Sequence, residues 1–241
     1  MIGTKTFCNK FRPLTELRSD HEVFSDFCEI SALSLRQPFE KSPKIEERFH
    51  EILKLYPEKA ATRFVDLLGT VVLALEEKPR DFLGECFHAL ELHNHYKGQF
   101  FTPYNVSHLM AEISLNGVKE HIEEKGYFTL NEPCCGSGAM IVAAYDVLKS
   151  QGINPTSSMW VAAQDIDYKC CCMAYIQMSL LAIPGVVVWG NTLTLENREQ
   201  WLTSGFYMFP WSVRLMKETA EKRRKSEENQ TDLFGQMEFD L

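Results

Sequence analysis

The sequence lacks a long apolar run, and this absence argues against a membrane protein. Its most apolar stretch, Phe64 to Leu75, is interrupted by Asp66, whereas a membrane-spanning helix requires about 18 apolar residues or more. The opening Met-Ile-Gly-Thr-Lys has no apolar core of the kind found in signal peptides. We therefore expect a soluble protein that resides in the cytoplasm and does not bind membranes.

The sequence also lacks a Cys-x-x-Cys pair, although it contains eight cysteines. Cys134 and Cys135 are adjacent, and residues 170–172 are three cysteines in a row. Contiguous residues cannot easily converge on one tetrahedral metal ion. We therefore expect no metal site, and we expect reduced thiols that are mostly buried.

The sequence also lacks an excess of basic residues. It contains 25 Lys and Arg and 33 Asp and Glu, which give a net charge of -8. A protein that holds nucleic acid mainly by coating its phosphates is normally basic. Any contact with nucleic acid must therefore depend on a local patch, a brief encounter or a partner subunit. The 45% of hydrophobic residues suffice for a sizeable core and exclude a wholly disordered chain.

Apolar residues recur at helical spacing in the first part of the chain. The spacing predicts helices over Lys44–Leu55 and Glu58–Glu77, and Asp81 is placed as the N-cap of another helix. Four prolines sit near the expected breaks: Pro38, Pro43, Pro57 and Pro79. We predict that residues 1–97 form an N-terminal helical cap of roughly four helices.

From Tyr127 onwards, strand patterns alternate with helices. The predicted elements are a strand at Phe128–Asn131, a helix at Ala139–Lys149, a strand at Met159–Ala163, a helix at Lys169–Leu181 and a strand at Gly185–Trp189. This order predicts an α/β domain over residues 98–213 with a parallel sheet, the first half of a nucleotide-binding sheet. Thr194–Leu202 suits a further helix and Phe206–Phe209 a fourth strand. Residues 214–241 are expected to be a charged helix and a mobile tail.

A glycine-containing turn follows the first predicted strand, with the sequence Asn131-Glu132-Pro133-Cys134-Cys135-Gly136-Ser137-Gly138. Glycines let the chain turn tightly and let a ligand approach the backbone, and the next helix presents free N–H groups there. Glu132 is placed to accept hydrogens from a ligand's ammonium or hydroxyl group. Such a turn also occurs where a helix merely begins, so both interpretations stay open.

Three more motifs accompany this turn. Gly98-Gln99-Phe100-Phe101-Thr102-Pro103 precedes a predicted helix, with Thr102 as N-cap and Pro103 as first helical residue, or with the helix end as an anion site. Gln164-Asp165-Ile166-Asp167 closes the second strand, where Asp165 could accept ribose hydroxyls and Asp167 could cap the next helix. Gly190-Asn191-Thr192-Leu193 closes the third strand, where an amide could meet an adenine edge.

These four motifs together resemble the adenine-N6 DNA methyltransferases, and in particular the modification subunits of type I restriction systems and small relatives on phages and mobile elements. The resemblance extends over about residues 81–195 and implies a partial Rossmann-like methyltransferase sheet behind the helical cap. It implies methylation of adenine N6 in DNA with S-adenosylmethionine as cofactor, in a bacterium or phage. It also implies a role in restriction-modification.

The resemblance also assigns roles to individual residues. Phe101 and Thr102, with the backbone after Pro103, would hold the methionine carboxylate of the cofactor. The turn residues Glu132, Pro133, Gly136 and Gly138 would line its methionine and ribose. Asp165 would bind the ribose hydroxyls, and Asn191 would lie beside the adenine ring, although the family usually has aspartate at that position.

One family motif is missing. Members hold the flipped adenine with a [DNS]-P-P-[YFW] loop, and no such tetrapeptide exists here. The nearest match is Met208-Phe209-Pro210-Trp211, which leaves Pro210 and Trp211 as the only catalytic candidates. Trp211 could stack on a base, but a core position is the commoner outcome for tryptophan. The alternative function is thus a catalytically deficient, cofactor-binding accessory, regulatory or anti-restriction protein.

The chain also leaves little room for a complete methyltransferase sheet. About fifty residues follow the third strand, so the first strand would keep an uncovered edge. The helical cap, a second copy in a homodimer, or a separate specificity or methyltransferase subunit could cover it. Finally, Gln230-Thr231-Asp232-Leu233-Phe234 resembles the short peptides with which bacterial proteins dock to the sliding clamp.

Overall fold

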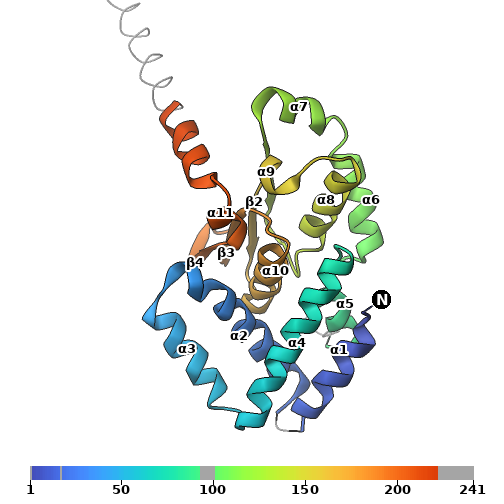
Figure 1. Ribbon diagram of the computed structural model, residues 1–241, viewed down its shortest axis with the longest axis vertical. Coiled ribbons are helices and arrows are strands. Elements are labelled where there is room, and N and C mark those ends of the chain that lie inside the picture. Colours follow the sequence, from blue (N-terminus) through green and yellow to red (C-terminus); the bar gives the residue numbers. More distant parts are fainter. Residues whose placement is uncertain (1, 17, 93–100, 222–241) are drawn as a thin grey trace, which may run out of the picture.

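The computed structural model describes residues 2–16, 18–92 and 101–221 of the chain. Figure 1 shows a group of helices from the N-terminal half packed beside a small sheet, with more helices at the other end of that sheet. Gly98, Gln99 and Phe100, which begin the motif that ends at Pro103, lie outside the described residues. The peptide Gln230–Phe234 lies outside them as well.

The described N-terminal residues form five α-helices and one short 3-10 helix, where roughly four helices were predicted. Their bounds are α1 (Thr4–Phe11), η1 (Arg12–Leu14), α2 (Asp20–Glu40), α3 (Pro43–Leu53), α4 (Glu58–Glu77) and α5 (Phe82–Ala89). The predicted helices that became α3 and α4 are confirmed, and Asp81 caps α5 by accepting from the Gly84 N–H. The break expected near Pro38 is confirmed, because α2 ends at Glu40, although Pro38 itself still lies inside this helix. It sits in the last turn, where its missing N–H costs a single helical bond.

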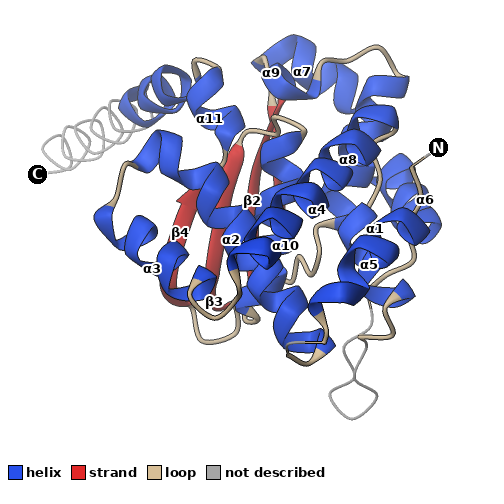
Figure 2. Ribbon diagram, turned by 60° about the horizontal axis from the view of Figure 1, so that its bottom comes forward, coloured by secondary structure: helices blue, strands red, loops and turns tan. Residues whose placement is uncertain are grey.

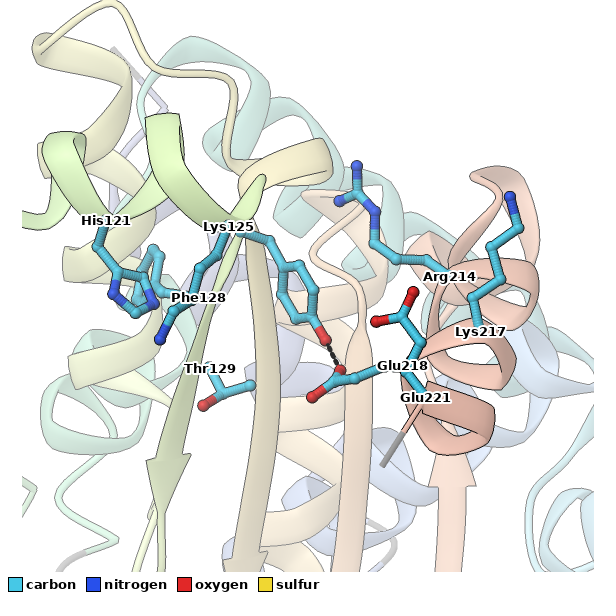
Figure 3. A pocket seen from close by; sticks show the side chains of 9 residues that line it. His121, Lys125, Phe128, Thr129, Arg214, Lys217, Glu218 and Glu221 are labelled. Carbon is cyan, nitrogen blue, oxygen red and sulfur yellow. Dashed lines mark hydrogen bonds between the residues drawn. The ribbon is translucent and has the colours of Figure 1, made fainter. Parts of the chain in front are cut away.

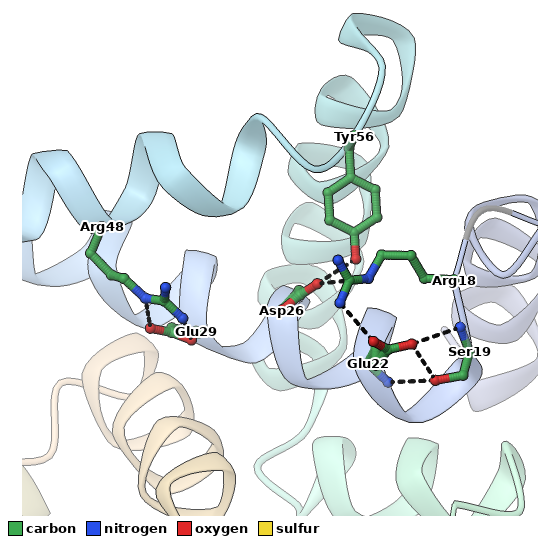
Figure 4. Close-up of polar contacts among 7 residues, drawn as sticks. All are labelled: Arg18, Ser19, Glu22, Asp26, Glu29, Arg48 and Tyr56. Atoms are coloured by element: carbon green, nitrogen blue, oxygen red, sulfur yellow. Dashed lines mark hydrogen bonds and ion pairs between the residues drawn. The ribbon is translucent and has the colours of Figure 1, made fainter.

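Polar contacts fix the start of α2 and its position against α3, as Figure 4 shows. Ser19 and Glu22 form a capping box, in which each side chain accepts from the other residue's backbone N–H. The Arg48 guanidinium of α3 donates to both carboxylate oxygens of Glu29 at 2.7 and 3.0 Å. The Tyr56 hydroxyl donates to Asp26 at 2.6 Å. The Arg48–Glu29 pair therefore joins α2 to α3, and the Tyr56–Asp26 bond joins α2 to the segment that follows α3.

The sheet has four strands in the order β1-β2-β3-β4. They are β1 (Phe128–Glu132), β2 (Met159–Asp165), β3 (Gly185–Asn191) and β4 (Glu196–Leu202). The first three pair in parallel, as predicted. Between and beside them lie α6 (Tyr104–Ser114), α7 (Val118–Lys125), α8 (Ala139–Ser150), α9 (Pro155–Ser158), α10 (Tyr168–Leu180) and α11 (Ser204–Met208).

Two predictions for the segment after β3 are wrong. The stretch expected as a helix at Thr194–Leu202 contains β4, which pairs antiparallel with β3 and so forms a hairpin. The stretch expected as a strand at Phe206–Phe209 overlaps α11. Gly205 packs directly on the backbone near Ala182, where a Cβ would lie 2.5 Å from a carbonyl oxygen. In both segments, tertiary packing rather than the weak local sequence pattern therefore determines the secondary structure.

Helix α10 lies at the centre of the core. It packs against β2 and β3 on one side and against α2, α4 and α5 on the other, and ten of its thirteen residues are buried. One continuous hydrophobic cluster runs from Phe7 to Trp201. Figure 2 shows these helices gathered in front of the sheet. The N-terminal helices and the α/β part therefore share a core.

The Ser19 cap provides a test of how far local contacts stabilise this arrangement. Ser19→Ala should lower the free energy of unfolding by about 1 kcal/mol, because the Glu22 N–H loses its side-chain acceptor. Ser42, the N-cap of α3, makes no side-chain cap bond, so Ser42→Ala should change stability by less than about 0.5 kcal/mol. Urea denaturation of the two variants checks this, and equal losses would contradict it.

Candidate functional site

A cavity of about 290 Å³ opens at the carboxyl end of β1, beside the start of α6. It is lined by Phe101, Thr102, Met110, Glu132, Cys134, Cys135, Gly136, Ser137, Ala139 and Met140. Four of the predicted cofactor residues therefore line it directly: Phe101, Thr102, Glu132 and Gly136. Pro103, Pro133, Gly138, Asp165 and Asn191 lie on the same motifs but do not line this cavity.

The glycine turn forms one wall of the cavity. Gly136 and Gly138 have positive φ angles of 53° and 94°, which only glycine adopts without strain. A Cβ on Gly136 would lie 3.1 Å from the Phe101 ring, and one on Gly138 would lie 3.3 Å from the backbone of Ala174 in α10. Glycine is therefore favoured at both positions for two reasons: the backbone has a positive φ angle, and neighbouring atoms leave little space for a Cβ.

Asp165 holds this turn against the end of β2. One carboxylate oxygen accepts from the Gly136 N–H at 2.8 Å, and the other accepts from the Asp167 N–H at 2.9 Å. Each oxygen keeps a further lone pair for a ligand hydroxyl. Asp167 caps α10 by accepting from the Lys169 N–H, so its expected capping role is confirmed, whereas the contact of Asp165 with ribose hydroxyls stays a prediction.

Glu132 is the acidic side chain of the cavity. It is half-buried, and desolvation raises the pKa of its carboxyl group, while the Cys134 N–H partly offsets this effect. A carboxylate with reduced access to water interacts strongly with a cationic or hydroxyl-bearing ligand. Glu132 is therefore the strongest electrostatic feature of the pocket.

The predicted capping role of Thr102 is wrong. Helix α6 begins at Tyr104, its N-cap is Pro103, and no side-chain cap bond is made. Proline at the N-cap rather than at the first helical position shifts the helix start by one residue. Phe101 packs against Phe87 with 4.9 Å between ring centroids. Thr102 instead lines the cavity.

Asn191 takes part in the turn between β3 and β4. Its side-chain oxygen accepts from the backbone N–H groups of Leu193 and Thr194 at 3.0 and 3.4 Å. The neighbouring Thr192 hydroxyl donates to the Pro133 carbonyl at 2.6 Å and ties this turn to the glycine turn. The proposed contact of Asn191 with an adenine ring stays a prediction.

Trp211 lies far from the cavity, and Pro210 precedes it directly. The Trp211 side chain is 2% exposed, donates to the Thr156 carbonyl at 2.8 Å and packs on Tyr127 and Trp160. Those neighbours mark the amino ends of β1 and β2, whereas the cavity is at the carboxyl end of β1. The geometry therefore gives no support to Pro210 and Trp211 as base-holding residues.

Sequence reasoning missed a buried polar cluster behind the glycine turn. The Asp81 carboxylate accepts from the Ser137 hydroxyl at 2.6 Å, from the Gln177 amide at 2.9 Å and from the Gly84 N–H at 3.0 Å. The Gln177 amide also donates to the Ser137 carbonyl at 2.7 Å. Asp81 was predicted only as a cap, and no local pattern marks Gln177 on its mostly buried helix.

Residues 2–16, 18–92 and 101–221 contain no group of three or more His, Cys, Asp or Glu side chains placed to hold a metal ion. No helix in the same residues is long and apolar enough to cross a membrane. Seven of the eight cysteines are buried, as expected, and Cys134 is exposed at the cavity.

Replacement of Gly138 tests the close approach of the turn to α10. Gly138→Ala should cost about 1–2 kcal/mol more than Gly126→Ala, because only the former adds contact with a backbone. Gly126 is a matched control with φ of 82° and no atom within 4 Å of its added Cβ. Thermal denaturation measures both, and a similar loss in the two variants would contradict the crowding argument.

The Asp81 cluster predicts a distinct dependence of stability on pH. Burial raises the pKa of Asp81, so the folded chain binds a proton more readily than the unfolded chain. The contribution of Asp81 to the free energy of unfolding therefore falls as pH rises from the ordinary pKa of an aspartate through the raised pKa of Asp81 in the folded chain. Asp81→Asn should remove this fall.

Asp81→Ala should instead cost about 3 kcal/mol at neutral pH, because it leaves buried donors unsatisfied and removes the cap of α5. Urea denaturation at several pH values measures both effects. The exposed Asp20→Asn serves as the control. An unchanged pH slope in Asp81→Asn would contradict the assignment.

Comparison with known proteins gives one positive result. The family model described as N-6 DNA Methylase matches residues 81–232, which is well over half of the chain. Comparisons with curated proteins and with solved structures gave no match. The matched residues begin at Asp81 and include the cavity, the glycine turn and the whole sheet. The chain therefore belongs to the N-6 DNA methylase family, the adenine-N6 DNA methyltransferases.

Proposed function

We propose that this chain binds S-adenosylmethionine in the cavity at the carboxyl end of β1 and methylates adenine N6 in DNA together with a partner subunit. Family membership supports the reaction class. The observation that carries the proposal is the conjunction of Glu132, Gly136 and Thr102 around one cavity. Such a site, at the carboxyl ends of parallel strands, is where α/β sheets bind ligands.

The residues present fit this cofactor. Gly136 approaches the Phe101 ring so closely that a Cβ would fill the space, so backbone rather than side chain faces the ligand. Glu132 would accept the ammonium group, and Thr102 with the backbone after Pro103 would donate to the carboxylate. Asp165 would accept from the ribose hydroxyls with its remaining lone pairs. The bound cofactor supplies an electrophilic methyl group on a sulfonium centre.

The chain's own contribution is to bind and orient rather than to transfer protons. Met110 and Met140 give the cavity apolar walls that limit water near the reacting group. Glu132 would hold one end of the cofactor, and Asp165, which accepts from the Gly136 N–H of the turn, would also hold the ribose. A direct transfer between well-oriented partners gains most of its rate from such positioning.

In this proposal, residues 98–213 form the cofactor-binding unit with a partial Rossmann-like sheet, and residues 1–97 form a helical cap on it. Residues 214–241 form a charged extension. Because no [DNS]-P-P-[YFW] tetrapeptide occurs, the acceptors for the adenine amino group come from the partner, a specificity or second methyltransferase subunit. We place the protein in the cytoplasm of a bacterium or in a phage, in a restriction-modification setting.

A second candidate is a catalytically deficient protein that binds the cofactor and acts as an accessory, regulatory or anti-restriction factor. The missing tetrapeptide favours this alternative, as does the position of Trp211 at the amino ends of the strands. Both candidates share the cofactor cavity and differ only in whether the methyl group reaches DNA.

The cofactor site is tested by calorimetric titration with S-adenosylmethionine. Glu132→Gln should weaken binding about 10- to 100-fold, because a half-buried charge-assisted contact to the ammonium is lost. Glu124→Gln, on the exposed face of α7, should leave affinity unchanged. Wild-type affinity should fall as pH is lowered through the raised pKa of Glu132, whereas the affinity of Glu132→Gln should not follow this trend.

Absence of binding at millimolar ligand would overturn the cofactor proposal. Binding that is the same in Glu132→Gln and wild type would remove Glu132 from the site. Transfer of tritiated methyl groups to DNA that lacks N6-methyladenine then separates the two candidates. Label in adenine supports the enzyme, and binding without transfer, with or without candidate partner subunits, supports the accessory protein.

A further inference from the structure

Helix α5 contacts both walls of the cofactor cavity, although none of its own residues lines that cavity. Its N-cap residue Asp81 accepts from Ser137 of the glycine turn. Near the other end of the helix, Phe87 packs against Phe101, which lines the opposite wall. One short helix therefore supports two cavity segments that are far apart in the sequence.

Ser137 links α5 to the cavity. Its hydroxyl donates to the Asp81 carboxylate at 2.6 Å, and its carbonyl oxygen accepts from the Gln177 amide at 2.7 Å. Asp81 and Gln177 are both buried, and the Gln177 amide also donates to Asp81. Ser137 is thus held by its side chain and by its backbone, in surroundings that exclude water and so strengthen the hydrogen bonds.

Phe87 supports the second wall. Its ring is fully buried, and the Lys169 ammonium of α10 lies 4.7 Å from the centre of the ring. Phe101 packs on Phe87 with 4.9 Å between the ring centroids. Phe101 in turn limits the glycine turn, because a Cβ on Gly136 would lie 3.1 Å from its ring. The spacing of the two walls therefore depends on Phe87, although Phe87 does not line the cavity.

A larger hollow of about 720 Å³ lies at the amino end of β1. Figure 3 shows Lys125 on one side of it and Lys217 and Glu221 on the other. These three side chains are exposed and carry charges of both signs. The Tyr127 hydroxyl donates to the Glu218 carboxylate there. That bond lies beside β1 but away from the cofactor cavity, so its removal provides a control.

We propose that Asp81, Gln177 and Phe87 are positioning residues of the cofactor site. Asp81 and Gln177 act through Ser137, and Phe87 acts through Phe101, so that the turn is ordered before the cofactor binds. An ordered site loses less conformational entropy on binding. This inference rests on the proposed function, because it assigns these residues to the binding of S-adenosylmethionine.

The test is calorimetric titration of full-length variants with S-adenosylmethionine. Ser137→Ala and Gln177→Met should each weaken binding about 10-fold or more, because each removes a hydrogen bond that holds the turn. Urea denaturation measures the stability of every variant and shows that it is folded at the temperature of the titration.

Two controls separate positioning from a general loss of stability. The buried Thr203 hydroxyl donates to the Ile183 carbonyl at 2.6 Å and accepts from the Gly185 N–H at 3.0 Å, at the amino end of β3. Thr203→Val should therefore lower stability as much as Ser137→Ala. Both Thr203→Val and Tyr127→Phe should keep the affinity within about twofold of wild type, because they act away from the cavity.

Replacement of Asp81 tests whether its hydrogen bonds carry the effect. Asparagine keeps an oxygen for the Gln177 amide, and its own amide can donate to the Ser137 hydroxyl oxygen. Asp81→Asn should therefore stay within about threefold of the wild-type affinity, whereas Asp81→Ala should lose about 10-fold or more.

Phe87→Leu tests the second wall and should weaken binding about fivefold, because Phe101 loses the ring that supports it. Phe64→Leu is the matched control, since Phe64 is a buried ring that packs on Phe27 and Tyr56. It should lower stability and leave the affinity unchanged.

The outcomes distinguish this inference from the cofactor proposal. Wild-type affinity in Ser137→Ala and Gln177→Met would overturn the positioning role and leave cofactor binding intact. Equal weakening in Thr203→Val would also overturn the positioning role, because lost stability would then explain the effect. A wild-type protein that does not bind the cofactor would overturn both proposals.

Discussion

The structure depends above all on satisfying one buried carboxylate. Asp81 is fully enclosed, so its oxygens need donors from the protein. The three donors come from three different segments, namely the start of α5, the glycine turn and the middle of α10. These bonds fix the N-terminal helices relative to the glycine turn. Packing of the apolar core alone would allow more freedom.

The fixed position of the glycine turn helps to explain the shape of the cavity. The turn is held from behind through Ser137 and from the side through Asp165, while Phe101 closes it from the α6 side. Each contact acts on a neighbouring residue of the same turn, so the backbone that faces a ligand has little room to move. Preorganisation of this kind lowers the entropic cost of binding.

The sequence predicted the elements whose local patterns agree with their surroundings. The strands that became β1, β2 and β3, the helices α3, α4, α8 and α10, and the pocket residue Glu132 belong to this group. It could not predict β4, because the strand depends on pairing with β3 and on burial of Trp201 against Arg36 from α2. The Asp81–Gln177 contact joins residues 96 positions apart, and a single sequence carries no signal for such a pair.

The edges of the sheet also limit how copies of the chain could associate. At one side, β4 presents Glu196, Arg198 and Glu199, and charged side chains on an edge strand oppose pairing with another strand. At the other side, β1 pairs only with β2 among the described strands. Strand pairing between two copies would therefore join β1 to β1, which closes a dimer around a twofold axis. Growth into a filament needs two open edges, and this sheet offers only one.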